Sequence, residues 1–159
     1  MILIVLATHK LGFKRLLDAV QKQIDKGNIQ EKVIAQVGHT DFHSNDMEIF
    51  DMISYDDFVS LVKKADLIIT HGGVGCIMDA IKEGKKVIAA PRLKKYNEAE
   101  NDHQLEIIEE FTKRGYILPL YDFDNLDKVL KEAKKFVPKK YKSNNLKMIK
   151  IIEDYIDKI

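Results

Sequence analysis

One stretch of the sequence decides the fold: Asp66-Leu-Ile-Ile-Thr-His-Gly-Gly-Val-Gly-Cys-Ile-Met-Asp79. Its first part, residues 66–70, is a short apolar run of the kind that a buried strand uses. Residues 74–83 have apolar side chains at helical spacing, and Gly84 marks the end of that helix. A strand that passes through glycines directly into a helix is the repeating unit of α/β proteins. The stretch therefore predicts one such unit in the middle of the chain.

The same alternation continues on both sides of this stretch. Apolar runs predict strands at residues 2–7, 32–37, 47–53, 66–70, 86–90 and 116–118. Amphipathic spacing predicts helices at residues 13–24, 55–64, 74–83, 101–113, 126–136 and 146–159. Parallel neighbouring strands need a crossover connection, which a helix supplies. The pattern predicts a single α/β domain over residues 1–159, with a Rossmann-like, doubly wound parallel sheet of about six strands and helices on both faces.

The bulk composition narrows the functions that the chain can have. Its 159 residues include 26 Lys and Arg against 25 Asp and Glu, and this balance disfavours nucleic acid as a partner because phosphate-backbone binders show a basic excess. Cys76 is the single cysteine, so an intrachain disulfide is impossible and a reducing, cytoplasmic setting fits best. No apolar stretch reaches the ~20 residues that cross a bilayer. Any membrane role is therefore expected to come through a partner or a surface patch.

The glycine loop after the strand at 66–70 is the first candidate site, because parallel sheets bind ligands at the carboxyl ends of their strands. Gly72, Gly73 and Gly75 let the backbone come close to a ligand, and the following helix start offers unpaired N–H groups and a partial positive charge to phosphate. His71 can add a hydrogen bond or a positive charge, and Asp79 can reach a ribose hydroxyl. Taken alone, the glycines fit a phosphate site and a simple tight turn equally well.

Two well-known phosphate motifs are excluded for this loop. A Walker loop needs Lys followed by Ser or Thr after its last glycine, and the residues after Gly75 are different. The dinucleotide fingerprint follows the first strand and spaces its glycines differently. A phosphate site here would belong to another class.

Two further loops on the same edge are candidates. The loop after the first strand contains Thr8 and His9, which either contact a substrate or are simply solvated. The segment Asn101-Asp102-His103-Gln104 opens a helix. For that segment alone, capping of the helix is the favoured interpretation, and its position beside the glycine loop favours ligand contact.

A metal site is not predicted. His39 and His43 lie close in sequence to Asp41 and Asp46, but their spacing matches no familiar set of metal ligands. We therefore predict neither a metal nor a cofactor.

These segments, taken in order, resemble a known family. The similar stretches are His71 to Asp79, Glu83 to Pro91, His103-Gln104 and Gly115. They resemble the C-terminal half of glycosyltransferases built from two facing Rossmann-like domains, and the similarity covers nearly the whole chain. It is strongest for proteins whose donor half is a separate small subunit. These are the cytosolic subunit of the two-part enzyme that adds the second N-acetylglucosamine to a dolichol-linked sugar, and the bacterial capsule and exopolysaccharide glycosyltransferase pairs.

The resemblance implies a role for each matching residue. His71 would contact the diphosphate, the groups around Gly75 and Cys76 would hold the α-phosphate, Asp79 would bind the ribose, and His103-Gln104 would face the sugar hydroxyls. The predicted nucleotide-sugar site thus comprises Thr8, His9, His71, Gly72, Gly73, Gly75, Cys76, Asp79, His103 and Gln104.

Three positions depart from the residues that are usual in the family. Cys76 stands where Ser or Thr is common, which weakens one phosphate hydrogen bond. Asp79 stands in place of Glu, which shortens the reach to the ribose. Ala7 stands in place of Gly, which gives the first loop less backbone freedom.

By resemblance, the chain would be the donor-binding catalytic subunit of a heteromeric glycosyltransferase. It would move a sugar from a UDP-sugar to a lipid-linked saccharide in polysaccharide or glycan biosynthesis. No side chain stands out as the general base that the acceptor hydroxyl needs. We therefore expect a membrane-anchored partner subunit to supply the acceptor half, with this chain in the cytoplasm at the membrane face.

The C-terminal segment and two alternative functions remain open at this stage. The apolar stripe of a helix within residues 140–159 favours packing on its own sheet, and its width leaves room for contact with a partner. The first alternative function is a non-catalytic accessory subunit that stabilises a separate transferase. The second is a stand-alone α/β enzyme that acts on a phosphorylated small molecule.

Overall fold

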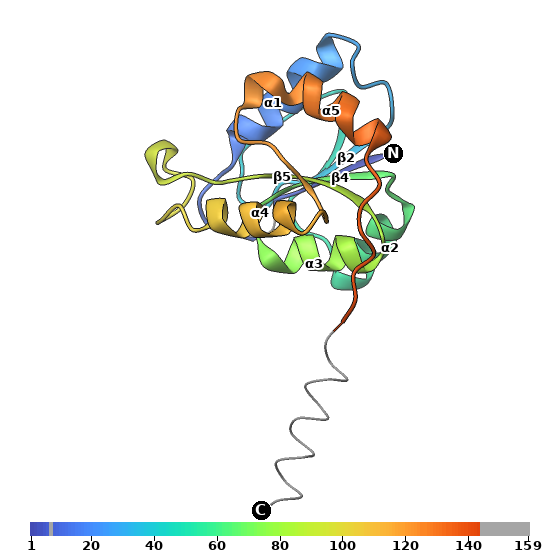
Figure 1. Ribbon diagram of the computed structural model, residues 1–159. Coiled ribbons are helices and arrows are strands. Elements are labelled where there is room, and N and C mark those ends of the chain that lie inside the picture. Colours follow the sequence, from blue (N-terminus) through green and yellow to red (C-terminus); the bar gives the residue numbers. More distant parts are fainter. Residues whose placement is uncertain (7, 144–159) are drawn as a thin grey trace, which may run out of the picture.

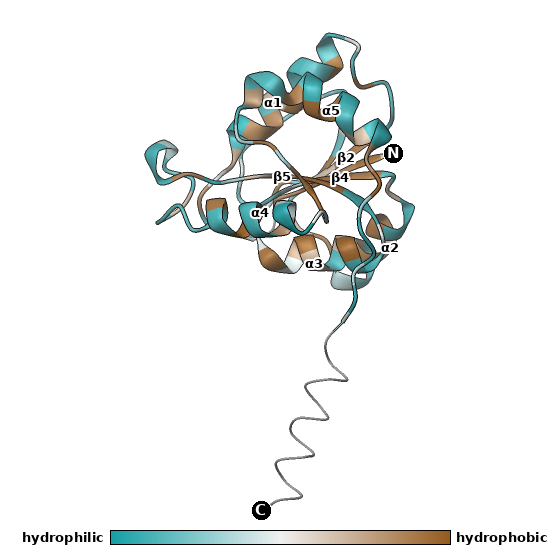
Figure 2. Cartoon of the chain, viewed as in Figure 1, coloured by the Kyte–Doolittle hydropathy of each residue, from teal (hydrophilic) through white to brown (hydrophobic). Residues whose placement is uncertain are grey.

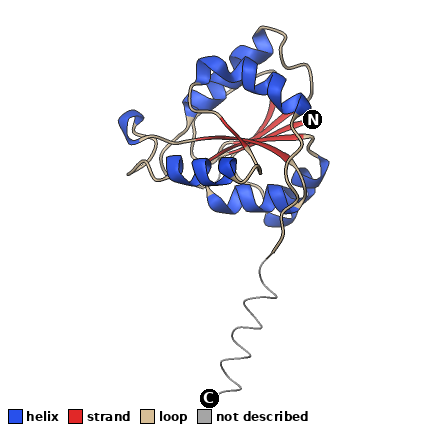
Figure 3. Ribbon diagram, in the orientation of Figure 1, coloured by secondary structure: helices blue, strands red, loops and turns tan. Residues whose placement is uncertain are grey.

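The computed structural model of the chain describes residues 1–6 and 8–143. Six parallel strands form one sheet in the order β3-β2-β1-β4-β5-β6 (Figure 3). The strands are β1 (Ile2–Val5), β2 (Val33–Gln36), β3 (Met47–Phe50), β4 (Leu67–His71), β5 (Lys86–Ala90) and β6 (Leu118–Pro119). This is the doubly wound order, in which the chain reverses direction across the sheet between β1 and β4. The predicted fold class is confirmed.

Helices cover both faces of the sheet, as predicted. They are α1 (Lys14–Asp25), α2 (Tyr55–Lys64), α3 (Val74–Lys82), α4 (Gln104–Lys113) and α5 (Leu126–Lys135), with short 3₁₀ turns η1 (Lys94–Tyr96) and η2 (Phe123–Asn125). Figure 1 shows α1 and α5 on one side of the sheet and α2, α3 and α4 on the other. The described part of the chain contains no helix that is both long enough and apolar enough to span a bilayer.

The two faces of the sheet carry separate apolar cores. Alternate residues of β1 point to opposite faces, so Ile4 packs with the α1 and α5 side while Leu3 packs with the α2, α3 and α4 side. Both residues are fully buried. Figure 2 shows the consequence, hydrophobic strands between helices whose outer surfaces are hydrophilic. Coverage on both faces is why the strands appear in the sequence as continuous apolar runs rather than alternating patterns.

Glycines end three of the helices where the sequence predicts them. Gly27, Gly84 and Gly115 have φ angles of +71°, +67° and +76°, in the left-handed region that residues with a Cβ rarely adopt. Gly115 N–H donates to the carbonyl of Thr112 at 2.8 Å, which closes α4.

Several element boundaries differ from the prediction. Strand β1 ends at Val5, β3 ends at Phe50 and β6 lies at 118–119, whereas the sequence suggested strands at 2–7, 47–53 and 116–118. Residue 7, the last residue of the strand predicted at 2–7, lies outside the described residues. The expected helix at 146–159, with its contact surface for a partner, also lies outside them.

The start of α4 also differs, for a physical reason. The helix begins at Gln104 rather than at residue 101. The side chain of Asp102 accepts a hydrogen bond from the backbone N–H of Lys94 at 2.7 Å, and that of Asn101 accepts one from the N–H of His103 at 3.1 Å. Such bonds from short polar side chains to the backbone compete with helix formation. No side chain caps α4 at His103, which differs from the capping interpretation; Asp102 instead holds the preceding loop, and Asn101 bonds to the residue before the helix.

Candidate functional site

Loops from β1, β4 and β5 meet at the carboxyl edge of the sheet and enclose a cleft. Its volume is about 780 Å³, within the usual range for small-molecule sites. It is lined by Thr8, His9, Lys10, Leu11, His71 and Glu100. The structure thus brings three of the predicted site residues, from two loops 62 or more positions apart, to one place beside the chain reversal between β1 and β4.

A smaller, more apolar pocket of about 230 Å³ adjoins this cleft, because Thr8 lines both. Its other walls are Val5, Gln36, Met52, Ile53, Tyr55, Phe58 and Cys76. Tyr55 and Phe58 also border the hollow that contains Asp79. The predicted residues Cys76 and Asp79 therefore lie on a continuous path that leads away from the cleft along α3.

The three glycines of the loop have different reasons for being glycine. A Cβ at Gly72 would lie 2.7 Å from Cβ of Gln104, and a Cβ at Gly73 would overlap Nε2 of His71. A Cβ at Gly75 would meet nothing within 4 Å, and Gly75 is exposed in the first turn of α3. Internal packing therefore explains Gly72 and Gly73, while the open space above Gly75 is available to a ligand.

The start of α3 adds hydrogen-bond donors to this open space. No side chain caps the helix at Gly73. The first N–H groups of a helix have no partner within it and carry a partial positive charge. An anion above Gly75 would satisfy them.

His71 is buried at the junction of the cleft and the glycine loop. Burial lowers its pKa to about 4, and the positive charge of Arg92 adds to this effect, while a hydrogen bond with the carbonyl of Val5 opposes it. The ring is therefore neutral at pH 7 in the ligand-free protein. The positive charge that His71 was expected to offer a diphosphate concerns the ligand-bound state and stays a prediction, while in the free protein burial and the charge of Arg92 favour the neutral ring.

Cys76 remains a protonated thiol. Burial raises the pKa of its thiol, and the negative charge of Asp79 raises it further. A thiol is a weaker hydrogen-bond donor than the hydroxyl of Ser or Thr. The sequence-based expectation of a weaker phosphate contact at this position follows from the same chemistry.

Gln104 and His103 lie differently from one another. Oε1 of Gln104 accepts hydrogen bonds from the backbone N–H of Gly72 and of Arg92, each at 3.0 Å. Gln104 thus ties the glycine loop to the loop after β5. His103 is exposed, its Nδ1 lies 3.1 Å from Oε2 of Glu106, and it lines neither of the two cavities.

Sequence analysis missed the residue that joins the loops of the site. Arg92 lies two residues after the end of β5, next to Pro91, and is only 1% exposed. Its guanidinium donates to the carbonyl of Leu11 at 2.6 Å and to that of Leu6 at 3.0 Å. Burial lowers its pKa to about 10, so it remains a cation at pH 7. A charged residue next to the proline that ends an apolar strand was the available signal.

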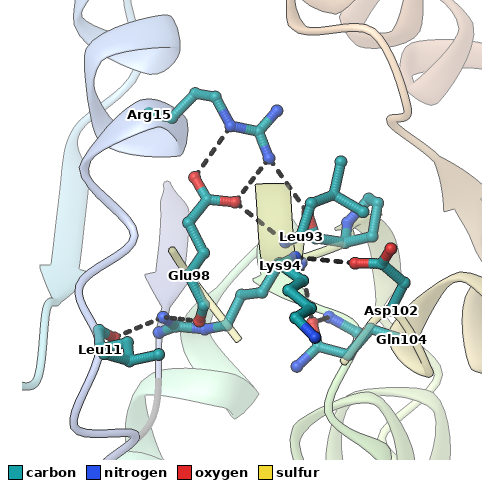
Figure 4. Close-up of polar contacts among 10 residues, drawn as sticks. Leu11, Arg15, Leu93, Lys94, Glu98, Asp102 and Gln104 are labelled. Atoms are coloured by element: carbon teal, nitrogen blue, oxygen red, sulfur yellow. Dashed lines mark hydrogen bonds and ion pairs between the residues drawn. The ribbon is translucent and has the colours of Figure 1, made fainter. Parts of the chain in front are cut away.

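A neighbouring ion pair fixes the rest of the loop after β5. Figure 4 shows the carboxylate of Glu98 between the guanidinium of Arg15 and the backbone of Leu93. Glu98 accepts from Nε and Nη2 of Arg15 at 2.9 and 2.8 Å, and from the N–H of Leu93 at 3.1 Å. Arg15 also lies over the rings of Tyr96 and Phe123, at 4.4 and 3.9 Å from their centroids. The backbone of this loop is held from two sides.

Two other places are poor candidates for the site. In the described residues, no three His, Cys, Asp or Glu side chains come together as metal ligands. His43 and Asp41 lie 3.5 Å apart and are almost fully exposed. A cavity of about 230 Å³ at the opposite edge of the sheet contains Lys86, whose Nζ already donates to the carbonyls of Ala133 and Lys134 at 2.8 Å.

Comparison with known proteins identifies the family. The sequence profile of the glycosyltransferase family 28 C-terminal domain matches residues 8–159. The chain is 31% identical over 71 residues to the UDP-N-acetylglucosamine transferase subunit ALG13 of Yarrowia lipolytica, covering 45% of this chain and 34% of that protein. It is 27% identical over 110 residues to the human protein of that name, covering 69% of this chain and 8% of that protein. The chain thus spans about a third or less of the length of these relatives.

Solved structures share the fold. The solution structure of ALG13 has a TM-score of 0.59 and 18% identity, and the match covers 91% of this chain and 90% of that one. The glycosyltransferase of kitacinnamycin has a TM-score of 0.59 and 16% identity, covering 83% of this chain and 34% of that one. At these identities the likeness establishes the fold.

The unequal surroundings of the glycines give a testable difference. Gly75→Ala should leave the free energy of unfolding unchanged or raise it by up to about 1 kcal/mol, because alanine favours a helix. It should weaken binding of inorganic pyrophosphate in calorimetry, because the new methyl fills the space above the helix start. Gly73→Ala is the matched comparison and should instead lower stability, since its methyl collides with His71. Equal pyrophosphate binding by wild type and Gly75→Ala would contradict a phosphate position above Gly75.

The pair of Arg15 and Glu98 should contribute to stability. Glu98→Gln removes the charge of a carboxylate that is 6% exposed and should lower the free energy of unfolding by roughly 2–3 kcal/mol, measured by urea denaturation, because it leaves cations unpaired in a partly buried place. Glu110→Gln breaks an exposed pair with Arg114 and should change stability by less than about 0.5 kcal/mol. A similar loss of stability in both variants would show that burial of the pair of Arg15 and Glu98 adds nothing to the free energy of unfolding.

Proposed function

Because the chain belongs to the glycosyltransferase family 28 C-terminal domains, we propose that it is the donor-binding catalytic subunit of a heteromeric glycosyltransferase. Its donor would be a UDP-sugar and its acceptor a lipid-linked saccharide in polysaccharide or glycan biosynthesis. The observation that supports this most is the open space above Gly75, at an uncapped helix start three residues after His71, which lines the cleft. The names of the relatives in Yarrowia lipolytica and human suggest UDP-N-acetylglucosamine as the first donor to test.

The arrangement of the cavities suggests how the donor lies. The diphosphate would bind above Gly75 at the helix start. The uracil ring fits the apolar pocket, where Tyr55 offers an aromatic face beside Met52. The ribose would then lie toward Asp79, which borders the same two aromatic residues. The sugar would extend into the larger cleft, toward His9 and Glu100.

Transfer in this site would depend on stabilising the leaving group. The acceptor hydroxyl oxygen forms a bond to the anomeric carbon as the bond from that carbon to the β-phosphate oxygen breaks. The nucleoside diphosphate leaves with the bonding electron pair, and the N–H groups of α3 stabilise its growing charge. The hydroxyl proton passes to a general base, for which the partner subunit is our candidate.

The surface of the chain favours a partner at this edge. Eight large apolar side chains are exposed among the described residues, and seven of them lie at or after the carboxyl ends of strands or in the first turn of the helices that follow. They are Phe50, Met52, Tyr55, Val74, Tyr96, Leu105 and Tyr121. Several exposed apolar side chains on one edge are typical of an interaction surface. We propose that a membrane-anchored subunit closes over it, so that the chain acts in the cytoplasm at the membrane face.

The nucleobase position can be tested with one tyrosine. Tyr55→Ala should weaken binding of UDP about tenfold, because base stacking on an aromatic ring contributes about 1–3 kcal/mol. Binding of inorganic pyrophosphate should change little. Tyr121→Ala removes another exposed tyrosine of the same edge that lines none of these cavities and should leave UDP binding unchanged. Calorimetry on the full chain measures the affinities of the wild type and of both variants. Equal UDP affinity in the wild type and in Tyr55→Ala would mean that the base binds elsewhere.

A catalytic subunit and an accessory subunit differ in one experiment. The chain co-purified with its partner should transfer N-acetylglucosamine from the UDP-sugar, and the double variant with His71→Gln and Asp79→Asn should lose at least about a hundredfold in kcat/KM, since each removed contact is worth about 1.4 kcal/mol or more. Full activity of the complex with the double variant would mean that the chain only supports another transferase. Absence of UDP-sugar binding, with and without the partner, would overturn the proposed function.

A further inference from the structure

The hydroxyl of Thr70 connects three groups beneath the site. Thr70 is the fourth residue of β4 and is fully buried, so no ligand touches it. Its Oγ1 donates to the carbonyl of Val5 at 2.8 Å and lies 3.3 Å from Nδ1 of His71. It also lowers the pKa of the thiol of Cys76. A hydroxyl has one hydrogen to donate and two lone pairs to accept with, so with its hydrogen on the carbonyl of Val5, Oγ1 faces Nδ1 of His71 as an acceptor.

These contacts decide which nitrogen of His71 carries the hydrogen. Since the hydrogen of Thr70 is given to the carbonyl of Val5, Oγ1 offers only a lone pair to Nδ1. The carbonyl of Val5 also raises the pKa of His71, which fits a ring N–H rather than a ring lone pair on this side. Nδ1 therefore carries the hydrogen in the neutral ring. Nε2, which lies against Gly73 below the start of α3, has a lone pair and no hydrogen.

A bare Nε2 is the wrong partner for a phosphate oxygen, because both atoms offer lone pairs. A contact requires a hydrogen on Nε2, from either a second proton or a switch of tautomer. The switch would turn the hydroxyl of Thr70 toward Nδ1 and leave the buried carbonyl of Val5 without the hydrogen of Thr70, at a cost of about 1–3 kcal/mol. A second proton keeps both bonds, and the charge that it adds is opposite to that of the diphosphate.

We propose that Thr70 is a positioning residue that fixes the tautomer of His71, so that His71 takes up a proton when the diphosphate of the donor binds and holds it as an imidazolium. This inference rests on the proposed function. Thr70 then accepts from the Nδ1–H of the imidazolium, and Nε2–H donates to the diphosphate.

The charges around His71 explain why its ring becomes protonated only when the ligand binds. The charges of Arg92 and His9 act on it directly, and Lys10 and Glu100 line the same cleft, while the nearest titratable groups of α3 in the sequence are Cys76 and Asp79. Arg92 is the buried charge among them, and with burial it keeps His71 neutral in the free protein. Two ionised phosphates within a few ångström reverse the sign of this field and raise the pKa of His71.

The sign of the pH dependence follows by linkage. The pKa of His71 is about 4 in the free protein and is higher in the complex. At any pH between these two pKa values, the complex therefore carries one more proton than the free protein. Donor affinity should fall as pH rises through the pKa of the complex, by up to about tenfold per pH unit. Above that pKa, the neutral ring makes no favourable contact and the affinity becomes constant.

Calorimetry with UDP-N-acetylglucosamine tests the proton uptake, because neither phosphate of this ligand titrates between pH 5.5 and 8.5. Titrations of the full chain in buffers of different ionisation enthalpy should show uptake approaching one proton per ligand at pH 6. His71→Gln, which places an uncharged amide near Nε2, should show none, whereas His9→Gln and His103→Gln should retain it. Uptake that survives in His71→Gln, or wild-type binding without uptake, would overturn the proposal while the donor site itself stands.

Two variants of Thr70 separate positioning from folding. Thr70→Ser retains the hydroxyl and should follow the wild type. Thr70→Val removes the acceptor of the imidazolium and should bind about tenfold or more weakly at pH 6, with a smaller loss at pH 8.5. An equal loss at both pH values would indicate a merely structural role.

Nitrogen-15 NMR of the histidine rings gives a readout that does not depend on the Thr70→Val variant folding. In the free wild-type chain, His71 should be the neutral tautomer with hydrogen on Nδ1, and in the complex both nitrogens should carry hydrogen. A free-state tautomer with hydrogen on Nε2 would contradict the role of Thr70. No binding at any pH would overturn both the proton uptake and the proposed function.

Discussion

A guanidinium that is almost completely removed from water lies beneath the loops of the site. Burying a cation is unfavourable unless hydrogen bonds and an opposite charge compensate it. Arg92 obtains its hydrogen bonds from the carbonyls of Leu6 and Leu11, which flank the loop after β1. Glu98 supplies the opposite charge. The hydrogen bonds of this buried cation therefore hold the loop after β1 and the loop after β5 in a fixed relative position. Gln104 ties the glycine loop to the same position through its hydrogen bonds with Gly72 and Arg92.

The same cation shapes the chemistry of the cleft. A buried charge acts through a low dielectric and is screened less by salt than an exposed one. It therefore favours an anion in the cleft while it opposes a second positive charge on His71. The ligand-free site combines a fixed cation, a neutral imidazole and the open start of α3. For the proposed function, this positive potential would favour a diphosphate, because it is already built into the fold.

The fold was predictable from the sequence because each element is locally consistent. The continuous apolar runs of β2, β4 and β5 could only be strands covered on both faces, and Gly27, Gly84 and Gly115 stood where helices must end. The boundaries that failed depend on contacts between distant residues. The delayed start of α4 follows from the bond of Asp102 to Lys94, which no local propensity encodes.

Some residues of the candidate site could likewise be predicted from the sequence, and others could not. The glycine loop and its neighbours were found because backbone geometry and order in the chain are visible in a sequence. Arg92 and Thr70 were missed, since a buried polar side chain cannot be told from an exposed one by its residue type alone. The distinction between Gly73 and Gly75 also needed three dimensions. Only the folded chain shows that one glycine makes room for His71 and the other leaves space open.

The thiol of Cys76 differs from a hydroxyl both in hydrogen bonding and in apolar packing. Its neighbours include the apolar wall of the smaller pocket, with Phe58 and Met52, as well as the start of α3. Sulfur is polarisable and packs well against aromatic rings, while its S–H is a poor donor to phosphate. In the proposed site, cysteine at this position would therefore weaken the hold on the phosphate and strengthen the apolar surroundings of the base. The backbone N–H groups of α3 and the imidazolium proposed at His71 would then carry more of the binding of the diphosphate.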